Sequence, residues 1–393
     1  MPADCPPVMV VKFGGSSVAT PTLLARVASR IRSFCQDGWR VAAVVSAMGR
    51  TTDKLLELAD TVSPHGRDER EVDQLLATGE IQSVTLLALA LRAQGVMARS
   101  LTAGQCGICA AGRHGRALIT SFDAQSVRQT LDEGAVAVVA GFQALDSRGD
   151  VMTLGRGGSD LTAIALAAAL DARVCSIYTD VGGLYSADPK IVPDAHKIPQ
   201  MDVSLCCELS HAGSRVLQAR CVELAARLNV PVYLASSFDE TEGSWIMKDV
   251  NERSGIAALA HETGWAEAVF SRTEKTWNLL SSLDDQGASP LDFAVTETRL
   301  TVWFKQGDKA VDDAWRRWNL TPLAVTRGLV SLSLIGSGIG NHPETARALT
   351  QLLIDQKTPP RRLTTSGNRL TCLVATDRID ELLNAVHRRF LCE

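Results

Sequence analysis

Short apolar runs alternate with amphipathic stretches over roughly the first 240 residues. Residues 8–13 are apolar and β-branched, which is typical of a buried strand, and residues 21–34 carry their apolar side chains on one helical face. Further strands are predicted at residues 40–48, 135–145 and 174–186, and further helices at 54–62, 81–95 and 160–172. This alternation predicts an α/β domain with a mainly parallel sheet.

The pattern changes near residue 250, where the chain becomes polar, Gly-containing and weakly periodic. Beyond that point the units are shorter: strands are predicted at 299–304, 329–338 and 369–375, and helices at 309–320, 343–356 and 380–390. Short alternating units of this kind indicate small α+β repeats. We therefore predict one domain over residues 1–250 and a second region over residues 251–393.

Composition and charge narrow the function classes. The 393 residues are 46% hydrophobic with a formal net charge of −4, so the basic field of a nucleic-acid-binding protein is not expected. No charge-free apolar run is long enough to predict a transmembrane helix, and the first residues lack the pattern of a signal peptide. The ten cysteines are scattered and lack zinc-finger spacing. These features predict a cytoplasmic protein with reduced thiols and no membrane partner.

Three glycine-rich segments each follow a predicted strand: KFGGSSV (12–18), TLGRGGSDLTA (153–163) and YTDVGGLYSADPK (178–190). Glycines let backbone N–H groups approach an anion, and the dipole of a following helix favours negative charge there. Each loop alone could be an ordinary turn. Because loops that follow parallel strands meet at one edge of a sheet, the three together predict a phosphate-binding site.

Other motifs exclude several enzyme classes. There is no GxxxxGK[ST] loop, no GxSxG elbow and no HExxH motif, which leaves Walker-type NTPases and common hydrolases without support. The segment GSGIGN (336–341) resembles half of a dinucleotide fingerprint but lacks the third glycine. The seven histidines show no metal-binding spacing, and we expect His114, His211 and His342 at the surface or behind the site.

At these motifs the sequence resembles the aspartate kinases of the amino-acid kinase superfamily. The resemblance runs through residues 8–240 and is carried by KFGGSSV, VVSAMGRTTDKL, LLATGE, VAGFQ, TLGRGGSDLTAIALAAAL and YTDVGGLYSADPKIVPDAHKI. It implies an amino-acid kinase fold, three-layered with a mainly parallel sheet, followed by an α+β pair of ACT-like, ferredoxin-like regulatory modules. It also implies that ATP phosphorylates the β-carboxylate of L-aspartate, with Mg²⁺ held mainly through the phosphates and with no direct metal ligand assigned.

The resemblance also implies roles for individual residues. Lys12 and Asp160 would be catalytic, and Glu80 and Arg156 would bind the amino group and the α-carboxylate of the substrate. The remaining substrate-binding positions are Ser46, Thr52 and Ser159. The nucleotide-binding positions are Lys12, Gly14, Gly15, Ser16, Thr179, Asp180, Tyr185, Lys190 and Arg215.

Several of these residues also have purely structural interpretations. Glu80 could be an acid favoured by the dipole at a helix N-terminus, and Ser46 could cap the following helix. Asp180 could be a turn residue and Tyr185 a half-buried core aromatic. Only the motifs taken together favour the functional interpretation.

The C-terminal region departs from the pattern that the resemblance implies. Residues 332–353 match the second module, but the first is degenerate: an Asp-x-Pro-Gly loop is absent after residue 270, and an Asn-Val-Asp strand start is reduced to Pro290-Leu291-Asp292. In the second module a Ser-Thr-Ser-Glu segment is Thr364-Thr365-Ser366-Gly367, which loses an acid. We therefore predict weak or altered feedback inhibition, with an effector amino acid that the sequence does not identify, and a homodimer or higher oligomer formed through this region.

Three alternatives stay open at this point. The chain could be another amino-acid kinase that acts on glutamate, N-acetylglutamate or a nucleotide. It could instead be a catalytically silent regulatory subunit that senses an amino acid through its ACT-like modules. A dehydrogenase would rest on GSGIGN alone.

Overall fold

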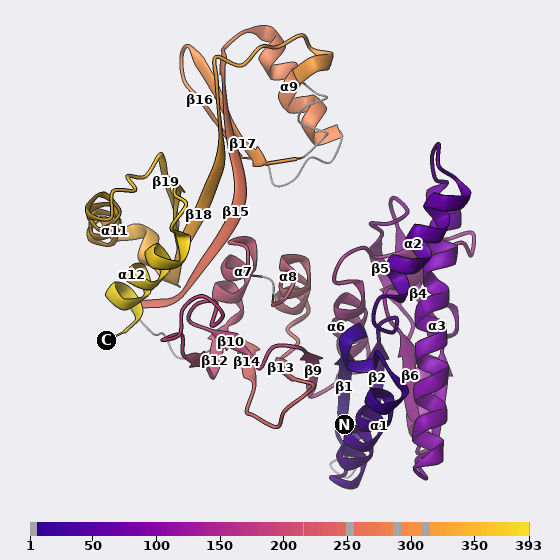
Figure 1. Cartoon of the computed structure of the whole chain (residues 1–393). Helices are drawn as coiled ribbons and strands as arrows, with labels where there is room; N and C mark the ends of the chain where they lie inside the picture. The colour runs from indigo at the N-terminus through magenta and orange to yellow at the C-terminus, as the bar shows by residue number, and fades with distance from the viewer. Residues whose placement is uncertain (1–5, 215, 249–254, 286–291, 308–314, 393) are drawn as a thin grey trace. The chain divides into compact units, whose positions relative to one another are not determined.

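The computed structural model describes residues 6–214, 216–248, 255–285, 292–307 and 315–392 (Figure 1). The chain divides into two compact units. The first unit comprises residues 1–184, 197–210 and 215–251, and the second comprises residues 185–196, 211–214 and 252–393. Two short segments from the first 250 residues thus group with the C-terminal part. The assignment of residues 1–250 to catalysis and 251–393 to regulation stays a prediction.

The first unit is built on an eight-stranded sheet with strand order β12-β14-β13-β9-β1-β2-β6-β3. Its strands are β1 (Val8–Phe13), β2 (Arg40–Val45), β3 (Ala98–Leu101), β6 (Val136–Ala140), β9 (Val174–Thr179), β12 (Gln200–Asp202), β13 (Val232–Ser236) and β14 (Ser244–Met247). All neighbours pair in parallel except β13 and β14. The predicted mainly parallel sheet is confirmed.

Helices cover both faces of this sheet and complete the three layers. They are η1 (Gly15–Val18), α1 (Pro21–Gln36), α2 (Thr51–Val62), α3 (Glu69–Ala93), α4 (Ala103–Cys106), α5 (Gln125–Asp132), α6 (Gly158–Ala169), α7 (Val203–His211) and α8 (Ala219–Leu228). A smaller sheet of order β5-β4-β7-β8 contains β4 (Ile108–Ala111), β5 (Leu118–Phe122), β7 (Gln143–Leu145) and β8 (Val151–Thr153). Two short strands, β10 (Leu184–Tyr185) and β11 (Lys197–Ile198), follow β9 along the chain.

The alternation of side chains along β1 decides which of them lie on each face of the sheet. Met9, Val11 and Phe13 belong to the core that α1 and α3 form with the sheet. Successive side chains of a strand point to opposite faces, so Lys12 lies on the other face, where α6 packs against β1. A lysine in an otherwise apolar strand is thereby kept out of the larger hydrophobic core.

Two predicted element boundaries were wrong. The apolar run 135–145 is not one strand but two, β6 and β7, which belong to different sheets. The break falls at Phe142, whose backbone is left-handed with φ of 71°. The helix predicted to begin at Ile81 begins at Glu69, where Asp68 accepts hydrogen bonds from the N–H groups of Arg70 and Glu71 and so caps the helix.

Helix α3 is long and apolar enough to cross a membrane by length and composition alone. Half of the relevant window is buried inside the protein, however, and α3 packs against α1, β3, β6 and β8. Its apolar face is therefore explained by the core of the first unit.

The second unit contains a six-stranded antiparallel sheet of order β16-β17-β15-β18-β20-β19. Its strands are β15 (Gly255–Ser271), β16 (Asp292–Val295), β17 (Arg299–Lys305), β18 (Ala324–Ser337), β19 (Arg362–Ser366) and β20 (Arg369–Ala375). Its helices are α9 (Glu274–Asp285), η2 (Ile339–Asn341), α11 (Pro343–Asp355) and α12 (Ile379–Leu391). The predicted α+β character of this region is confirmed.

Two βα modules share the long strands β15 and β18. The C-terminal part of β15 pairs with β17, whereas its N-terminal part pairs with the end of β18, which also pairs with β20. Each module has its own core, one around Phe270 and Leu300 and one around Leu349 and Val386. The sheet of the second module therefore includes the N-terminal part of β15, which precedes the first module in the chain.

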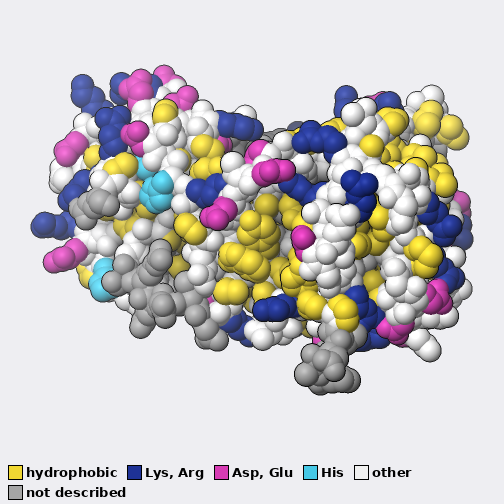
Figure 2. All heavy atoms as spheres, turned by 90° about the horizontal axis from the view of Figure 1, so that it is seen from below, with side chains coloured by type: hydrophobic (Ala, Val, Ile, Leu, Met, Phe, Trp, Pro, Cys, Tyr) yellow, Lys and Arg dark blue, Asp and Glu magenta, His cyan; other side chains and the backbone are white. Residues whose placement is uncertain are grey.

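GSGIGN begins in the last two residues of β18, in an antiparallel sheet, so it lacks the parallel βαβ setting of a dinucleotide fingerprint. The expected helix 309–320 falls partly, and Pro290 and Leu291 wholly, outside the described residues. Figure 2 shows Lys and Arg side chains interspersed with Asp and Glu on one face of the molecule, in keeping with the small net charge.

Candidate active site

A cavity of about 940 Å³ lies at the carboxyl ends of strands in the first unit. Seven residues predicted from the sequence line it: Lys12, Ser46, Thr52, Glu80, Arg156, Ser159 and Asp160. They come from β1, the loop after β2, α2, α3, the loop after β8 and the start of α6. The fold thus brings together every predicted catalytic and substrate-binding position.

Lys12 and Asp160 form a nearly buried ion pair in this cavity. Lys12 Nζ lies 2.7 Å from Asp160 Oδ1, and Lys12 is 8% exposed. The contact is ionic but not aligned as a hydrogen bond, and no other described residue donates to that oxygen. Asp160 stands in the first turn of α6, where the helix dipole favours a carboxylate. The acid therefore orients the ammonium while leaving it donors for an anion.

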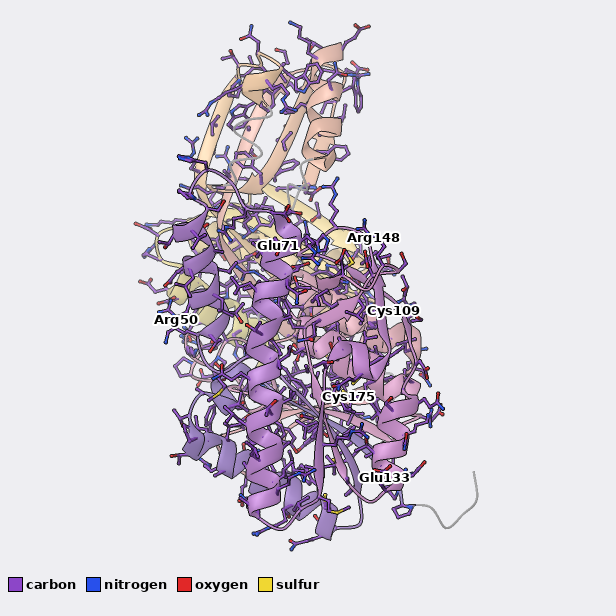
Figure 3. The ribbon with its side chains drawn as sticks, turned by 90° about the vertical axis from the view of Figure 1, so that its right-hand side faces the viewer. Arg50, Glu71, Cys109, Glu133, Arg148 and Cys175 are labelled. Atoms are coloured by element: carbon purple, nitrogen blue, oxygen red, sulfur yellow. The ribbon has the colours of Figure 1, made fainter. Side chains whose placement is uncertain are left out.

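Two buried thiols lie close to this pair. Cys175 on β9, in the interior of the sheet in Figure 3, and Cys221 on α8 are both fully buried. Burial raises the pKa of both thiols, and the negative charge of Asp160 adds to the rise. In such a setting the attraction between Lys12 and a phosphate is stronger than it would be in water.

Glu80 is a buried carboxylate with one unsatisfied oxygen. It is 2% exposed; its Oε1 accepts a hydrogen bond of 2.9 Å from the N–H of Ala47, whereas Oε2 has no partner among the described residues. Burial raises the pKa of Glu80 to about 7, against the opposing effect of the Ala47 N–H. Because Glu80 lies in the middle of α3, it is not an acid at a helix N-terminus. An unpaired oxygen of this kind suits a ligand ammonium.

Ser46 and Ser159 contact one another across the cavity wall. Ser46 Oγ donates a hydrogen bond of 3.0 Å to Ser159 Oγ. Ser46 does not cap α2, which begins at Thr51 and has Arg50 in the capping position. Both hydroxyls can therefore turn toward a bound ligand.

The first glycine-rich loop offers fewer free amides than its sequence predicts. The N–H of Gly14 donates to Tyr178 O at 3.3 Å, so it is already engaged. Gly15 and Ser16 begin η1, and the first N–H groups of a helix have no partner within it. A Cβ on Gly15 would lie 2.7 Å from the carbonyl oxygen of Ala47, which is why only glycine fits there. The amides left for a phosphate are those of Gly15 and Ser16.

Apart from Lys12, the predicted nucleotide-binding residues do not line this cavity. Thr179 ends β9, the neighbour of β1, and its Oγ1 donates to Asp180 Oδ1 at 3.0 Å. Tyr185 and Lys190 group with the second unit, and Arg215 lies outside the described residues. The nucleotide positions therefore stay predictions.

The lining residues that were not predicted as ligands include Asp73, His114 and Phe142. Phe142 belongs to the VAGFQ motif, which the resemblance already marked without assigning a residue. A bulky residue with φ of 71° is a strained backbone position, and such positions cluster at functional sites. Asp73 lies seven residues before Glu80, and no sequence motif marks it as a functional residue.

Comparisons with known proteins agree with this geometry. Residues 7–236 match the model of the amino acid kinase family. The chain is 37% identical to the aspartokinase of Mycolicibacterium smegmatis, over 98% of this chain and 96% of that protein. It is 35% identical to the aspartokinase of Corynebacterium glutamicum, with the same coverage.

The fold is also similar to a solved structure. Escherichia coli aspartokinase III in complex with aspartate and ADP matches with a TM-score of 0.84 and 22% identity, covering 98% of this chain and all of that one. At this identity the match shows the fold alone. Because the family model spans more than half of the chain and both relatives match nearly end to end, the chain belongs to the aspartokinases of the amino acid kinase family.

Proposed function

We propose that the chain transfers the γ-phosphoryl group of ATP to the β-carboxylate of L-aspartate, using the residues of the 940 Å³ cavity in the roles given below. One observation carries the assignment. A lysine–aspartate pair, a guanidinium (Arg156) and a buried carboxylate with an unpaired oxygen (Glu80) line the same cavity. These groups complement the two carboxylates and the ammonium of a free acidic amino acid.

Substrate recognition uses the two charged groups on the α-carbon of the amino acid. Arg156 binds the α-carboxylate through two parallel N–H···O bonds, and Glu80 Oε2 accepts from the α-ammonium. Ligand binding supplies the buried Glu80 with the countercharge that it lacks in the free protein. Ser46, Thr52 and Ser159 complete the contacts as hydroxyl donors and acceptors.

The chemical step needs little covalent help from the protein. The β-carboxylate is ionised near pH 7, so it attacks the γ-phosphorus without a general base. A carboxylate O–P bond forms while the bond from phosphorus to the β,γ-bridging oxygen breaks, which yields 4-phospho-L-aspartate and ADP. Lys12, held by Asp160, and the amides of Gly15 and Ser16 stabilise the charge on the transferring group.

Mg²⁺ fits this site as an ion that arrives with ATP. Among the residues that the structure describes, no three His, Cys, Asp or Glu side chains group as metal ligands. An ion held mainly by phosphates and water does not need such a group. When bound, Mg²⁺ neutralises phosphate charge. The nucleotide is proposed to be held by Thr179, Asp180, Tyr185 and Lys190, which stand in the motif YTDVGGLYSADPK. Arg215 is proposed to join them because the family resemblance implies a nucleotide-binding role at its position.

We also infer a cytoplasmic enzyme that forms a dimer or higher oligomer through the second unit and that has weak or altered feedback inhibition. The dimer rests on the ACT-like character of the antiparallel sheet with its two modules. The regulatory inference rests on the missing acid at Gly367. Neither affects the assignment of the reaction.

A hydroxamate assay tests the proposed function. Hydroxylamine traps an acyl phosphate as a coloured hydroxamate, so the signal should require the protein, ATP, Mg²⁺ and L-aspartate together. A signal with glutamate but not with aspartate would overturn the substrate. No turnover by the intact wild-type chain would favour a silent regulatory subunit.

A further inference from the structure

The carboxylate of Asp73 is buried deep in the first unit and fully occupied. Asp73 lies on α3 and is 1% exposed. Its Oδ1 accepts from Thr153 Oγ1 at 2.5 Å and from the N–H of Gly115 at 3.1 Å. Its Oδ2 accepts from His114 Nδ1 at 2.8 Å, from the N–H of Thr153 at 2.9 Å and from the N–H of Gly115 at 3.0 Å. Little accepting capacity is left for a ligand, so Asp73 holds protein groups in place.

These donors belong to two chain segments that both line the substrate cavity. His114 and Gly115 lie between β4 and β5, and Thr153 ends β8. The segments are also tied directly, because the N–H of Ala117 donates to Thr153 O at 3.0 Å. One carboxylate on α3 thus anchors both segments to the same turn of the helix.

The anchored segments lead straight to Arg156. Gly155 packs on the carbonyl of Gly115 so closely that a Cβ there would lie 2.9 Å from Gly115 O, and its φ of +77° also requires glycine. Arg156 is the next residue and lines the cavity together with His114. Any movement of the His114–Gly115 segment would therefore move the backbone that carries Arg156.

The same helix carries Glu80, two turns after Asp73. Residues seven positions apart lie on the same face of a helix and are separated by about 10 Å along its axis. The α-ammonium and the α-carboxylate of the substrate would thus be bound by groups that α3 positions. Glu80 lies on α3 itself, and Arg156 is held to α3 through Asp73 and its donors.

We propose that Asp73 and His114 are a positioning pair that fixes the Arg156 loop against α3, and so sets the spacing between the carboxylate and ammonium subsites. This inference rests on the proposed roles of Arg156 and Glu80. The pair thereby lets α3 fix the distance between the groups that bind the α-carboxylate and the α-ammonium. When this distance is no longer fixed, aspartate binds more weakly. Discrimination against glutamate, whose extra methylene shifts the reacting carboxylate, is also reduced.

His114 gives the cleanest test, because its ring lies at the cavity wall and the Gly115 N–H still binds Asp73 when the ring is removed. In His114→Ala the KM for aspartate should rise by about tenfold, the change expected when a charged hydrogen bond is misplaced. The KM for ATP should change by less than about twofold. The preference for aspartate over glutamate in kcat/KM should fall.

Three further variants separate positioning from general damage. His114→Asn places an amide donor near the position of Nδ1 and should restore most of the aspartate KM. Asp73→Asn should show the same pattern more strongly, since an amide cannot accept from all of these donors. The matched control is Glu71→Gln, on the same helix, exposed and ion-paired with Arg70, and it should behave as wild type (Figure 3).

The outcomes are distinguishable. An unchanged aspartate KM in His114→Ala, or an equal rise in the KM values for aspartate and ATP, would refute the positioning role even if Asp73→Asn fails to fold. A wild-type protein that does not phosphorylate aspartate in the same assay would instead refute the proposed function.

Discussion

Lys12 Nζ and Asp160 Oδ1 lie 2.7 Å apart at the junction of β1 and α6, with no other described donor to that oxygen. The pair places a cation where charge develops during phosphoryl transfer. We expect Lys12→Met to lower kcat by about 10³-fold, because it removes a preorganised and nearly buried cation. Asp160→Asn should lower kcat by about 10²-fold, because Lys12 stays but loses its orientation.

Steady-state kinetics with the hydroxamate assay measures both changes. The matched control for Lys12→Met is Lys54→Met, which alters an exposed lysine of α2 outside the cavity lining. A Lys12→Met protein that folds and keeps wild-type kcat would contradict the catalytic role.

The raised pKa of Glu80 predicts how aspartate binding depends on pH. Burial raises this pKa to about 7 in the free protein, and only the ionised carboxylate attracts the substrate ammonium. The KM for aspartate should therefore rise as the pH falls from about 8 through 7 to 6. The KM for ATP should not follow the same curve. A flat aspartate KM over this range would show that Glu80 does not meet the ammonium.

The same pKa predicts a stability gain on substitution. The unfolded chain releases the Glu80 proton near the ordinary glutamate pKa of 4.5, whereas burial in the folded chain raises this pKa to about 7. The folded state binds more protons in this window, so the free energy of unfolding falls as pH rises from 4.5 to 7. Glu80→Gln should lose aspartate kinase activity yet unfold with a free energy on the order of 2 kcal/mol higher at pH 8.

Thermal or urea unfolding of ligand-free protein at pH 5 and pH 8 measures this effect. The advantage of Glu80→Gln over wild type should be small at pH 5 and larger at pH 8. An equal difference at both pH values would contradict the linkage, whatever its sign.

Phe142 combines a strained backbone with a side chain at the cavity. With φ of 71°, a non-glycine residue carries roughly 1 kcal/mol of strain, which glycine relieves. Both Phe142→Ala and Phe142→Gly remove the ring that packs near Gly158, but only glycine relaxes the backbone. The glycine variant should therefore be the more stable of the two by about 0.5–1 kcal/mol, as measured by urea unfolding. Both variants should bind aspartate more weakly.

The catalytic and substrate-binding side of the cavity was predictable from the sequence because its information is local. Lys12, Glu80, Arg156 and Asp160 stand in short motifs beside strand ends or on helices, and parallel topology brings such ends to one edge. Alternation then decides that Lys12 faces α6 rather than the larger core.

What could not be predicted depends on pairings between distant positions. Asp73 binds Thr153, eighty residues away, and no periodicity marks either as a partner of the other. The break at Phe142 is a backbone torsion inside a continuous apolar run, so the run was predicted as one strand. The grouping of residues 185–196 with the second unit likewise follows from tertiary contacts that a linear boundary does not express.

The missing acid at Gly367 predicts weak feedback inhibition. If an effector ammonium meets the acid of a Ser-Thr-Ser-Glu segment in relatives, Gly367 leaves it unpaired after β19 here. Losing such a charged hydrogen bond costs about 1.5–3 kcal/mol, or roughly 10- to 100-fold in affinity. Millimolar lysine, threonine or both should therefore inhibit the wild type weakly.

A Cβ on Gly367 meets no atom within 4 Å, so Gly367→Glu fits and should increase inhibition. Gly367→Gln is its uncharged control, and strong wild-type inhibition at micromolar effector would contradict the prediction.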